Sequence, residues 1–477
     1  MKKLNEIIDC TYDVEIKGIK TNSKEIEEGD LFVCIKGVNV DRHDYIEEAI
    51  SKGAVAAIVS KDVDVNIPVV KVEDPDSILD SLCAKFYDNP DTKMCLIGVT
   101  GTDGKTSVAT IIQALIGLDK CGYIGTNGRS CHAFNKEIDN TTPSSDKLYE
   151  YFYDFVNAGC KYTVMEASSE AFYRGRLKSF TFDASAYTNI TYEHLNTHKT
   201  MENYIDCKCN LFRQTKNDGI CVLNHDDEHF EEVYKTCNGT IYTYGMKEDN
   251  DMQIVWMKVL PNKTEFKIKY EGVETVIETH LLGDFNVYNL VTGLLVCLKL
   301  GFKLEDLIKN IPSIKISGRL DMVDLGQDFY VMVDYAHTPN GITKLLNFVN
   351  TLDINRSIVV IGQAGERDPY KRPVVGKVVS DNATHAIFTY EDPRSEDPKD
   401  IINDMIRDIK DKDNYEIVID RKEAIKKAVN MAEPGDMVLI LGKGNETYEK
   451  IKTGKIYFND EEEAIEALEE RLKIKES

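Results

Sequence analysis

Short apolar runs alternate with longer amphipathic segments along most of the chain, a pattern typical of β-strands joined by helices. In the middle of the chain the apolar runs are residues 162–165, 183–187 and 219–223, and an earlier run at 94–97 precedes a helical segment at 107–116. Strands that are separated by helices favour a parallel sheet. We therefore expect an α/β fold with a parallel-sheet domain at its centre.

The N-terminal part repeats this alternation on a smaller scale. Residues 29–35 predict a turn followed by a strand, residues 45–53 a helix that ends at a glycine, and residues 54–59 a further strand. The sequence Asp-Asn-Pro-Asp at 88–91 is typical of a linker. A small α/β domain should therefore precede the central one.

The C-terminal part differs in the spacing of its strands. After an alternating, β-rich stretch at 253–278, which predicts an antiparallel insertion, and a helix at about 286–300, short apolar runs recur at 330–334, 357–361, 385–389, 416–419 and 437–441. Helical segments separate these runs. This pattern predicts a doubly wound, Rossmann-like domain, which binds its ligands at the carboxyl ends of its strands.

The length of 477 residues exceeds what one hydrophobic core supports and suggests about three domains. We place them at residues 1–90, 91–316 and 317–477. No apolar stretch approaches the roughly 20 residues of a membrane span, and the N-terminus lacks the apolar core of a signal peptide. We therefore expect a cytoplasmic protein that does not enter a membrane.

The net charge of −23 argues against a nucleic-acid partner, although a local cluster of cations can still bind a small anion. The 12 cysteines include no Cys-x-x-Cys pair. In a reducing compartment they should be free thiols, many of them buried, and a zinc site is not expected.

The most informative motif is Gly-Val-Thr-Gly-Thr-Asp-Gly-Lys-Thr-Ser at 98–107, directly after an apolar run. Glycines let backbone N–H groups approach phosphate oxygens, Lys105 supplies a positive charge, and the Thr106 hydroxyl can bind Mg²⁺. The usual first glycine is replaced by Val99, with glycines on either side of it. The alternative is an ordinary turn between a strand and a helix.

Three further residues follow or lie near predicted strands of the same sheet. Glu166 follows the strand at 162–165 and could hold a metal, or could simply cap a helix. His194 follows the next strand and could be a second ligand, although a lone histidine is usually structural. Lys208 lies on a mostly apolar helix, where a lysine normally extends its charged end to solvent.

Taken together, these motifs resemble the Mur ligase family, ATP-dependent enzymes that join an amino acid to a UDP-N-acetylmuramoyl peptide. The resemblance covers nearly the whole chain. It includes Gly283-Asp284-Phe285 with Asn286-Val287-Tyr288-Asn289, then Gly318-Arg319, and the run Asp334-Tyr335-Ala336-His337-Thr338-Pro339.

The resemblance implies roles for individual residues. The catalytic residues would be Lys105, Glu166, His194 and Lys208. The ligands of Mg²⁺ would be Thr106, Glu166, His194 and Lys208, with Lys208 modified to N6-carboxylysine. The ATP contacts would be Gly101, Thr102, Gly104, Lys105, Thr106, Ser107, Asn286, Asn289, Arg319 and Asp334.

Within the family, the chain resembles the branch that adds the third residue of the peptidoglycan stem. Its UDP-sugar contacts would be Ser23, Thr141, Thr142, Ser168 and Arg176. The sequence Asp392-Pro393-Arg394 resembles the Asn-Pro-Arg of the meso-diaminopimelate-adding members, and Gly-Lys-Gly-Asn-Glu at 442–446 resembles their Gly-Lys-Gly-His-Glu. The implied amino-acid contacts are Arg367, Asp392, Arg394, Gly442 and Glu446.

The expected substrates are thus ATP, UDP-N-acetylmuramoyl-L-alanyl-D-glutamate and a diamino acid, and the expected protein is a monomer. Four departures from the family pattern, Glu170, Glu193, Asp392 and Asn445, bear on the choice of amino acid. The alternatives are the same reaction with L-lysine, a folylpolyglutamate synthetase, or a nucleotide-binding relative without ligase activity. Arg394 could also be no more than a partner in a surface salt bridge.

Overall fold

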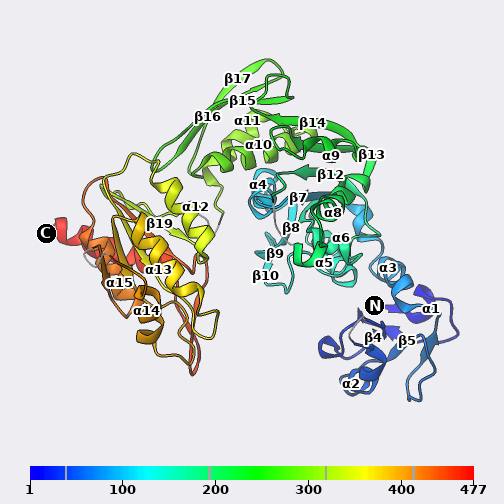
Figure 1. The fold of residues 1–477 in the computed structure, drawn as a ribbon. Helices are drawn as coiled ribbons and strands as arrows, with labels where there is room; N and C mark the ends of the chain where they lie inside the picture. Colours follow the sequence, from blue (N-terminus) through cyan, green and yellow to red (C-terminus); the bar gives the residue numbers. More distant parts are fainter. Residues whose placement is uncertain (38–39, 192–194, 317–319, 411–413, 477) are drawn as a thin grey trace. The chain divides into compact units, whose positions relative to one another are not determined.

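Three largely parallel sheets organise the computed structural model, which describes residues 1–37, 40–191, 195–316, 320–410 and 414–476 (Figure 1). The chain divides into two compact units. Unit 1 comprises residues 1–253 and 288–307, and unit 2 comprises residues 254–287 and 308–477. The predicted α/β class is confirmed.

Unit 1 begins with a small parallel sheet in the order β3-β4-β5-β6. Its strands and the helices that follow them are β3 (Gly18–Lys20), β4 (Asp30–Val33), α2 (Ile46–Ser51), β5 (Ala56–Val59), β6 (Val69–Lys71) and α3 (Pro75–Phe86). Every residue of β4 and β5 is buried, because apolar side chains cover both faces of this sheet. Asp74 accepts a hydrogen bond from Asp76 N, and Pro75 is the first residue of α3. These two residues fix the start of the helix.

The larger sheet of unit 1 has β7 near its centre, in the order β10-β9-β8-β11-β7-β12-β13-β14. The elements are β7 (Cys95–Thr100), α4 (Lys105–Ile116), β8 (Cys121–Gly125), β9 (Gly128–Cys131), β10 (Phe134–Lys136), α5 (Ser145–Asn157), β11 (Tyr162–Glu166), α6 (Ser169–Tyr173), β12 (Phe182–Tyr187), α7 (Leu195–His198), α8 (Met201–Arg213), β13 (Thr215–Asn224), α9 (Phe230–Tyr234) and β14 (Thr240–Gly245). The four predicted strands β7, β11, β12 and β13 pair in parallel, as expected. The parallel strands β8 and β14 and the antiparallel strands β9 and β10 were not predicted.

Two helix and strand boundaries differ from the sequence prediction in ways that affect the site. Helix α4 starts at Lys105 rather than Ser107, because Gly104 takes the left-handed conformation (φ +83°) and turns the chain into the helix at once. Strand β11 includes Glu166 as its last residue, and Glu166 pairs with Val99 of β7. The lysine and the carboxylate are therefore held by regular structure rather than by loops.

The chain then passes through β15 (Met252–Val259), the antiparallel hairpin β16 (Thr264–Tyr270) and β17 (Val273–Thr279), and helices α10 (Asp284–Lys299) and α11 (Leu304–Asn310). The antiparallel insertion and the helix that follows it were both predicted. No helix among the described residues is long and apolar enough to cross a membrane.

Unit 2 is built on a six-stranded sheet in the order β18-β19-β23-β20-β21-β22, parallel except at β18. Its elements are β18 (Asp321–Met322), β19 (Tyr330–Asp334), α12 (Pro339–Val349), β20 (Ser357–Ile361), α13 (Lys371–Asn382), β21 (His385–Phe388), α14 (Pro398–Ile406), β22 (Tyr415–Ile417), α15 (Arg421–Met431), β23 (Met437–Leu441), β24 (Tyr448–Ile451), β25 (Gly454–Tyr457) and α16 (Asp460–Glu476). Buried apolar clusters lie on both faces of the sheet, which confirms the doubly wound prediction.

Candidate functional site: a phosphate loop and an acid-lined lysine

The loop between β7 and α4 is held in place by the segment that follows the neighbouring strand β12. Thr102 N donates to Asn189 O (2.8 Å), and Asp103 N donates to Asn189 Oδ1 (3.0 Å). Thr188 Oγ1 in turn donates to Asp103 O (2.7 Å). A side chain at Gly104 would begin 2.5 Å from Asn289 Oδ1 of α10, so this close approach requires glycine. The loop is therefore pre-shaped before any phosphate arrives.

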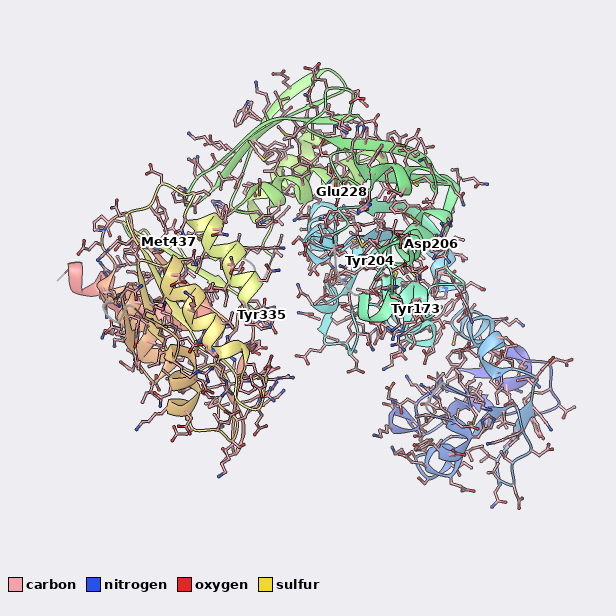
Figure 2. The ribbon with its side chains drawn as sticks, in the orientation of Figure 1. Tyr173, Tyr204, Asp206, Glu228, Tyr335 and Met437 are labelled. Carbon is pink, nitrogen blue, oxygen red and sulfur yellow. The ribbon has the colours of Figure 1, made fainter. Side chains whose placement is uncertain are left out.

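Two lysines converge on one carbonyl of this loop. Lys105 Nζ donates to Gly101 O (3.0 Å) and to Thr102 O (2.8 Å), and Lys208 Nζ from α8 donates to the same Gly101 O (2.5 Å). Lys208 is 1% exposed and its ammonium lies 4.4 Å from the centre of the Tyr204 ring, which is labelled in Figure 2. Lys208 therefore does not extend to solvent. Two positive charges are concentrated where a phosphate would bind.

Glu166 is held beside this loop by three donors from the end of β8. Its Oε1 accepts from the Tyr123 hydroxyl (2.8 Å) and from Thr126 N (2.8 Å), and its Oε2 accepts from Thr126 Oγ1 (3.3 Å). Burial, together with the Glu166 charge, raises the pKa of Tyr123 well above its usual value, so this hydroxyl stays a donor. The carboxylate is buried and fixed, and it retains lone pairs for a cation.

The predicted sugar-nucleotide contacts, with one exception, form a continuous hydrogen-bonded group next to Glu166. Thr142 Oγ1 lies 3.0 Å from Ser168 Oγ and donates to Glu166 O (2.8 Å), and Arg176 donates to Thr142 O (2.8 Å). The Thr141 and Thr126 hydroxyls are 3.1 Å apart. The exception is Ser23, which lies between β3 and β4 of the small sheet and whose hydroxyl donates to Glu48 (2.9 Å).

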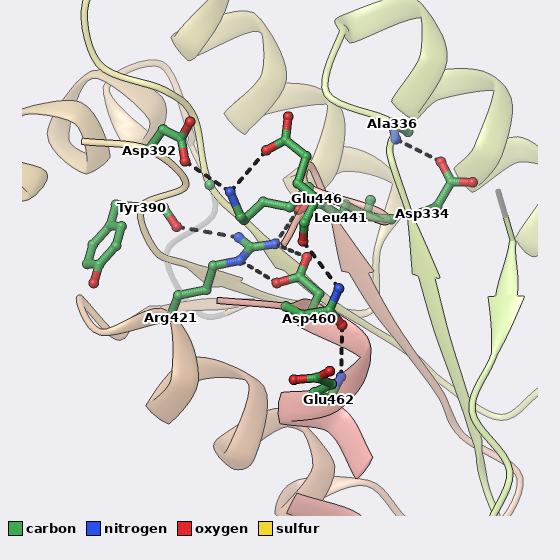
Figure 3. Close-up of polar contacts among 12 residues, drawn as sticks. Asp334, Ala336, Tyr390, Asp392, Arg421, Leu441, Glu446, Asp460 and Glu462 are labelled. Carbon is green, nitrogen blue, oxygen red and sulfur yellow. Dashed lines mark hydrogen bonds and ion pairs between the residues drawn. The ribbon is translucent and has the colours of Figure 1, made fainter. Parts of the chain in front are cut away.

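In unit 2, a buried lysine after β23 is surrounded by carboxylates. Lys443 Nζ lies 2.9 Å from Asp392 Oδ1 and 3.1 Å from Glu446 Oε2, and Figure 3 shows these two acids directed at the same ammonium. The charge of Lys443 also acts on Glu391 and Glu449. We call these five residues, Lys443, Asp392, Glu446, Glu391 and Glu449, the Lys443 cluster.

Two carboxyls of the Lys443 cluster titrate near neutral pH. Burial is the main reason that the pKa of Glu391 rises to about 7, against the opposing charges of Arg421 and Lys443. Burial likewise raises the pKa of Glu449 to about 7. Arg421 is fully buried and forms a bidentate ion pair with Asp460 at the start of α16, with N–O distances of 2.8 and 2.7 Å. This ion pair lies next to the cluster (Figure 3).

Arg394 lies in a shallow depression beside this cluster. Its backbone takes the left-handed conformation (φ +55°) and is anchored by a hydrogen bond from Arg394 N to Lys450 O (2.9 Å). Its Nε is buried and has no hydrogen-bond partner among the described residues. Lys450, Lys452 and Lys455 line the same depression, which therefore suits a carboxylate.

The remaining predicted residues are scattered or fall outside the described residues. Asp334 accepts hydrogen bonds from Leu320 N (2.8 Å) and Ala336 N (2.7 Å), so it shapes the loop after β19. Arg367 is exposed and Asn286 donates to Leu282 O (2.8 Å). His194 and Arg319, with Gly318 and Glu193, lie outside the described residues.

Several residues of the site were missed by the sequence analysis. Tyr123 and Thr126 hold Glu166, and Glu391, Lys443 and Glu449 complete the acid-lined cluster. Thr126, Glu391 and Lys443 each follow a strand, whereas Tyr123 lies within β8 and Glu449 within β24. What brings them to the site is strand order and packing, which are not visible in the sequence. Glu170, one of the four departures, forms a 2.8 Å ion pair with Arg174 on the surface.

Models of the Mur ligase family match three stretches of the chain: the family's catalytic-domain model at residues 15–87, its middle-domain model at 99–297 and its glutamate ligase-domain model at 318–444. Among curated proteins, the UDP-N-acetylmuramoyl-L-alanyl-D-glutamate--2,6-diaminopimelate ligase of Bacillus cereus is 38% identical over 99% of this chain and 100% of the relative. The protein of the same name from Listeria monocytogenes is 37% identical over 98% of this chain and 99% of its own length.

Solved structures agree in fold. A structure of a protein with this same name aligns with a TM-score of 0.74 at 27% identity, over 98% of this chain and 99% of that one. A folylpolyglutamate synthase from Mycobacterium tuberculosis aligns over 76% of this chain and 91% of its own, at a TM-score of 0.58 and 14% identity, which shows a shared fold alone. The chain therefore belongs to the Mur ligase family, and it is a ligase.

Proposed function

We propose that this protein is the ATP-dependent ligase that adds meso-diaminopimelate to UDP-N-acetylmuramoyl-L-alanyl-D-glutamate in peptidoglycan precursor synthesis. The observation that carries the proposal is the convergence of Lys105 and Lys208 on Gly101 O, next to the buried Glu166. The names of relatives that are 37–38% identical over nearly the whole chain support the choice of substrates.

The phosphate loop would bind the ATP phosphates. Lys105 now donates to two neutral carbonyls, and a triphosphate offers it charged acceptors, which make stronger hydrogen bonds. Gly101, Thr102, Gly104, Thr106 and Ser107 would supply the loop and the helix N-terminus around the phosphates. Asn286, Asn289, Arg319 and Asp334 would contact the nucleoside.

The donor set next to the loop fits Mg²⁺, a hard cation that prefers oxygen ligands. Thr106, Glu166 and His194 would hold it, together with a carbamate on Lys208. When bound, Mg²⁺ would neutralise charge on the phosphates. A carbamate on Lys208 would place an anion where the structure has a buried cation that donates to Gly101 O.

The reaction would proceed through an acyl phosphate. A carboxylate oxygen of the D-glutamate residue attacks the γ-phosphorus, the bond to the β-phosphate oxygen breaks, and ADP leaves. The amine of the incoming amino acid then attacks the acyl carbon, loses a proton and expels phosphate. Lys105 would stabilise the charge on the transferred group, and Thr141, Thr142, Ser168 and Arg176, with Ser23, would position the sugar-linked acid.

The Lys443 cluster and Arg394 would bind the amino acid. Arg394 would take the distal carboxylate of meso-diaminopimelate, with Arg367 as a further carboxylate contact. Glu446, Asp392 and Gly442 would receive its ammonium. We further propose three domains at residues 1–90, 91–316 and 317–477, and a monomer that works in the cytoplasm.

The decisive experiment is an amino-acid panel. The purified protein is incubated with ATP, Mg²⁺, the UDP-muramoyl dipeptide and one amino acid: meso-diaminopimelate, L-lysine or L-ornithine. The products are then identified by mass spectrometry. We expect the meso-diaminopimelate tripeptide. A lysine tripeptide as main product would refute the amino-acid assignment, and ATP binding without any amide would refute the ligase.

A further inference from the structure

Three sulfur and nitrogen donors meet at the end of unit 1's large sheet that is opposite to the phosphate loop. Cys131 ends β9, His132 follows it, and Cys160 precedes β11. Glu166 ends that same strand β11, so the strand separates this group from the ligase site. The donor atoms of the three side chains all lie within 4.8 Å of one another.

This spacing is close to that of a tetrahedral metal site. Bond lengths of about 2.3 Å to sulfur and 2.0–2.1 Å to nitrogen place the donors roughly 3.5–3.8 Å apart. The three donors therefore need to move by less than about 1 Å. Within the described part of the chain, this is the one such group of three or more histidine, cysteine or acidic residues.

The chemistry of the group favours a thiophilic ion. Both thiols are buried, whereas His132 is exposed and offers a route for entry. A water molecule would supply the fourth ligand. His132 N donates to Leu118 O (2.9 Å), which ties the histidine to the turn before β8.

We propose that Cys131, His132 and Cys160 form a binding site for a divalent ion of the Zn²⁺ class, separate from the ligase site. The ion would replace two thiol protons and link the end of β9 to the turn before β11. With three protein ligands, its fourth position would stay open to water. The sequence alone predicts no zinc site, because these ligands lack the usual Cys-x-x-Cys spacing.

Cobalt is the most direct probe. The full-length protein, fully reduced with a phosphine and freed of metal, is titrated with Co²⁺. We expect one equivalent to produce a thiolate-to-cobalt charge-transfer band and intense tetrahedral bands, and Zn²⁺ to abolish both. Oxygen ligands of the ligase site cannot produce a thiolate band, so the readout is independent of the proposed function.

Variants locate the ion. C131S and C160S should lose the charge-transfer band. H132Q, an exposed change that leaves both buried thiols intact, should weaken Co²⁺ binding by at least about tenfold, because even second-shell losses cost that much. H132C should restore tight binding with a more intense charge-transfer band. The control is the double variant C221S/C237S, a hydrogen-bonded thiol pair with one member in β13 and the other between α9 and β14, which should leave the bands unchanged.

Two results would overturn the proposal. One is a fully reduced wild-type protein that shows no charge-transfer band at any Co²⁺ concentration. The other is a band that persists in C131S, C160S and H132Q alike. Ligase activity of H132Q should stay at the wild-type level, since this residue lies outside the proposed catalytic machinery.

Discussion

The phosphate-loop site of unit 1 and the Lys443 cluster of unit 2 occupy equivalent positions and carry opposite chemistry. Each lies at the carboxyl ends of parallel strands, after β7 and β11 in one unit and after β21 and β23 in the other. In unit 1, lysines donate to neutral carbonyls. In unit 2, a lysine is surrounded by carboxylates.

The difference shows how one topology serves two ligands. Lys105 donates to neutral carbonyls, which bind a cation more weakly than a phosphate does, so the first site is ready for an anion. Carboxylates in excess over one lysine attract an ammonium, so the second site is ready for an amine. A ligase that activates an acid with ATP and then admits an amine needs one site of each kind.

The largest effect should come from Lys105→Ala. Loss of the cation that faces the transferred phosphoryl group should reduce ligation by on the order of 10²–10³-fold or more, measured as phosphate release. Lys93→Ala, an exposed lysine just before β7, serves as the control. Full turnover by Lys105→Ala would exclude the phosphate-loop assignment.

Variants of Lys208 distinguish a role as a cation from a role as a carbamate. Lys208→Ala should lose activity and regain part of it in high bicarbonate, and Lys208→Arg should be inactive because it keeps the charge but cannot form the carbamate. Lys235→Ala, an exposed lysine after α9, is the matched control. Wild-type rates in either Lys208 variant would rule out the carbamate.

A variant of Arg394 tests the proposed amino-acid site of unit 2. Arg394→Ala should raise the KM for meso-diaminopimelate by roughly tenfold to hundredfold, because a charge-assisted hydrogen bond contributes about 1.5–3 kcal/mol. Any turnover of L-lysine should be unchanged, since lysine lacks the distal carboxylate. Arg407→Ala, on the surface at the end of α14, is the control. An equal loss with both amino acids would indicate a structural role.

The smallest effect concerns stability. The pKa values of Glu391 and Glu449 rise from 4.5 to about 7 on folding, so the folded state binds more protons than the unfolded state between these values. The free energy of unfolding should therefore fall as pH rises from about 4.5 to about 7, by at most about 3 kcal/mol per group.

Urea denaturation at a series of pH values measures this slope. Glu391→Gln and Glu449→Gln should each flatten it, whereas Glu469→Gln, on the exposed side of α16, should not. An unchanged slope in both cluster variants would show that these carboxyls are charged at neutral pH.

Much of the fold was predictable because buried parallel strands have a distinct pattern. The strands at 330–334, 357–361 and 437–441 match β19, β20 and β23 residue by residue. The meander β8–β9–β10 was missed, since its strands are short and two of them carry few apolar residues.

The site was predictable only where a motif marks it. Lys105 and Glu166 follow from local sequence, but the burial of Lys208 depends on how α8 packs against the loop. The excess of carboxylates around Lys443 depends on three segments that strand order brings together. Pairings of this kind arise from tertiary structure, which local patterns do not encode.

The central claim is that ATP activates the carboxylate at the phosphate loop before the amine reacts. The most direct test is to label both oxygens of the D-glutamate carboxylate with ¹⁸O and to analyse the phosphate released during ligation. The account predicts that each phosphate carries one ¹⁸O atom, transferred when the acyl phosphate breaks down. Phosphate without label, with all ¹⁸O retained on carbon or in water, would contradict it.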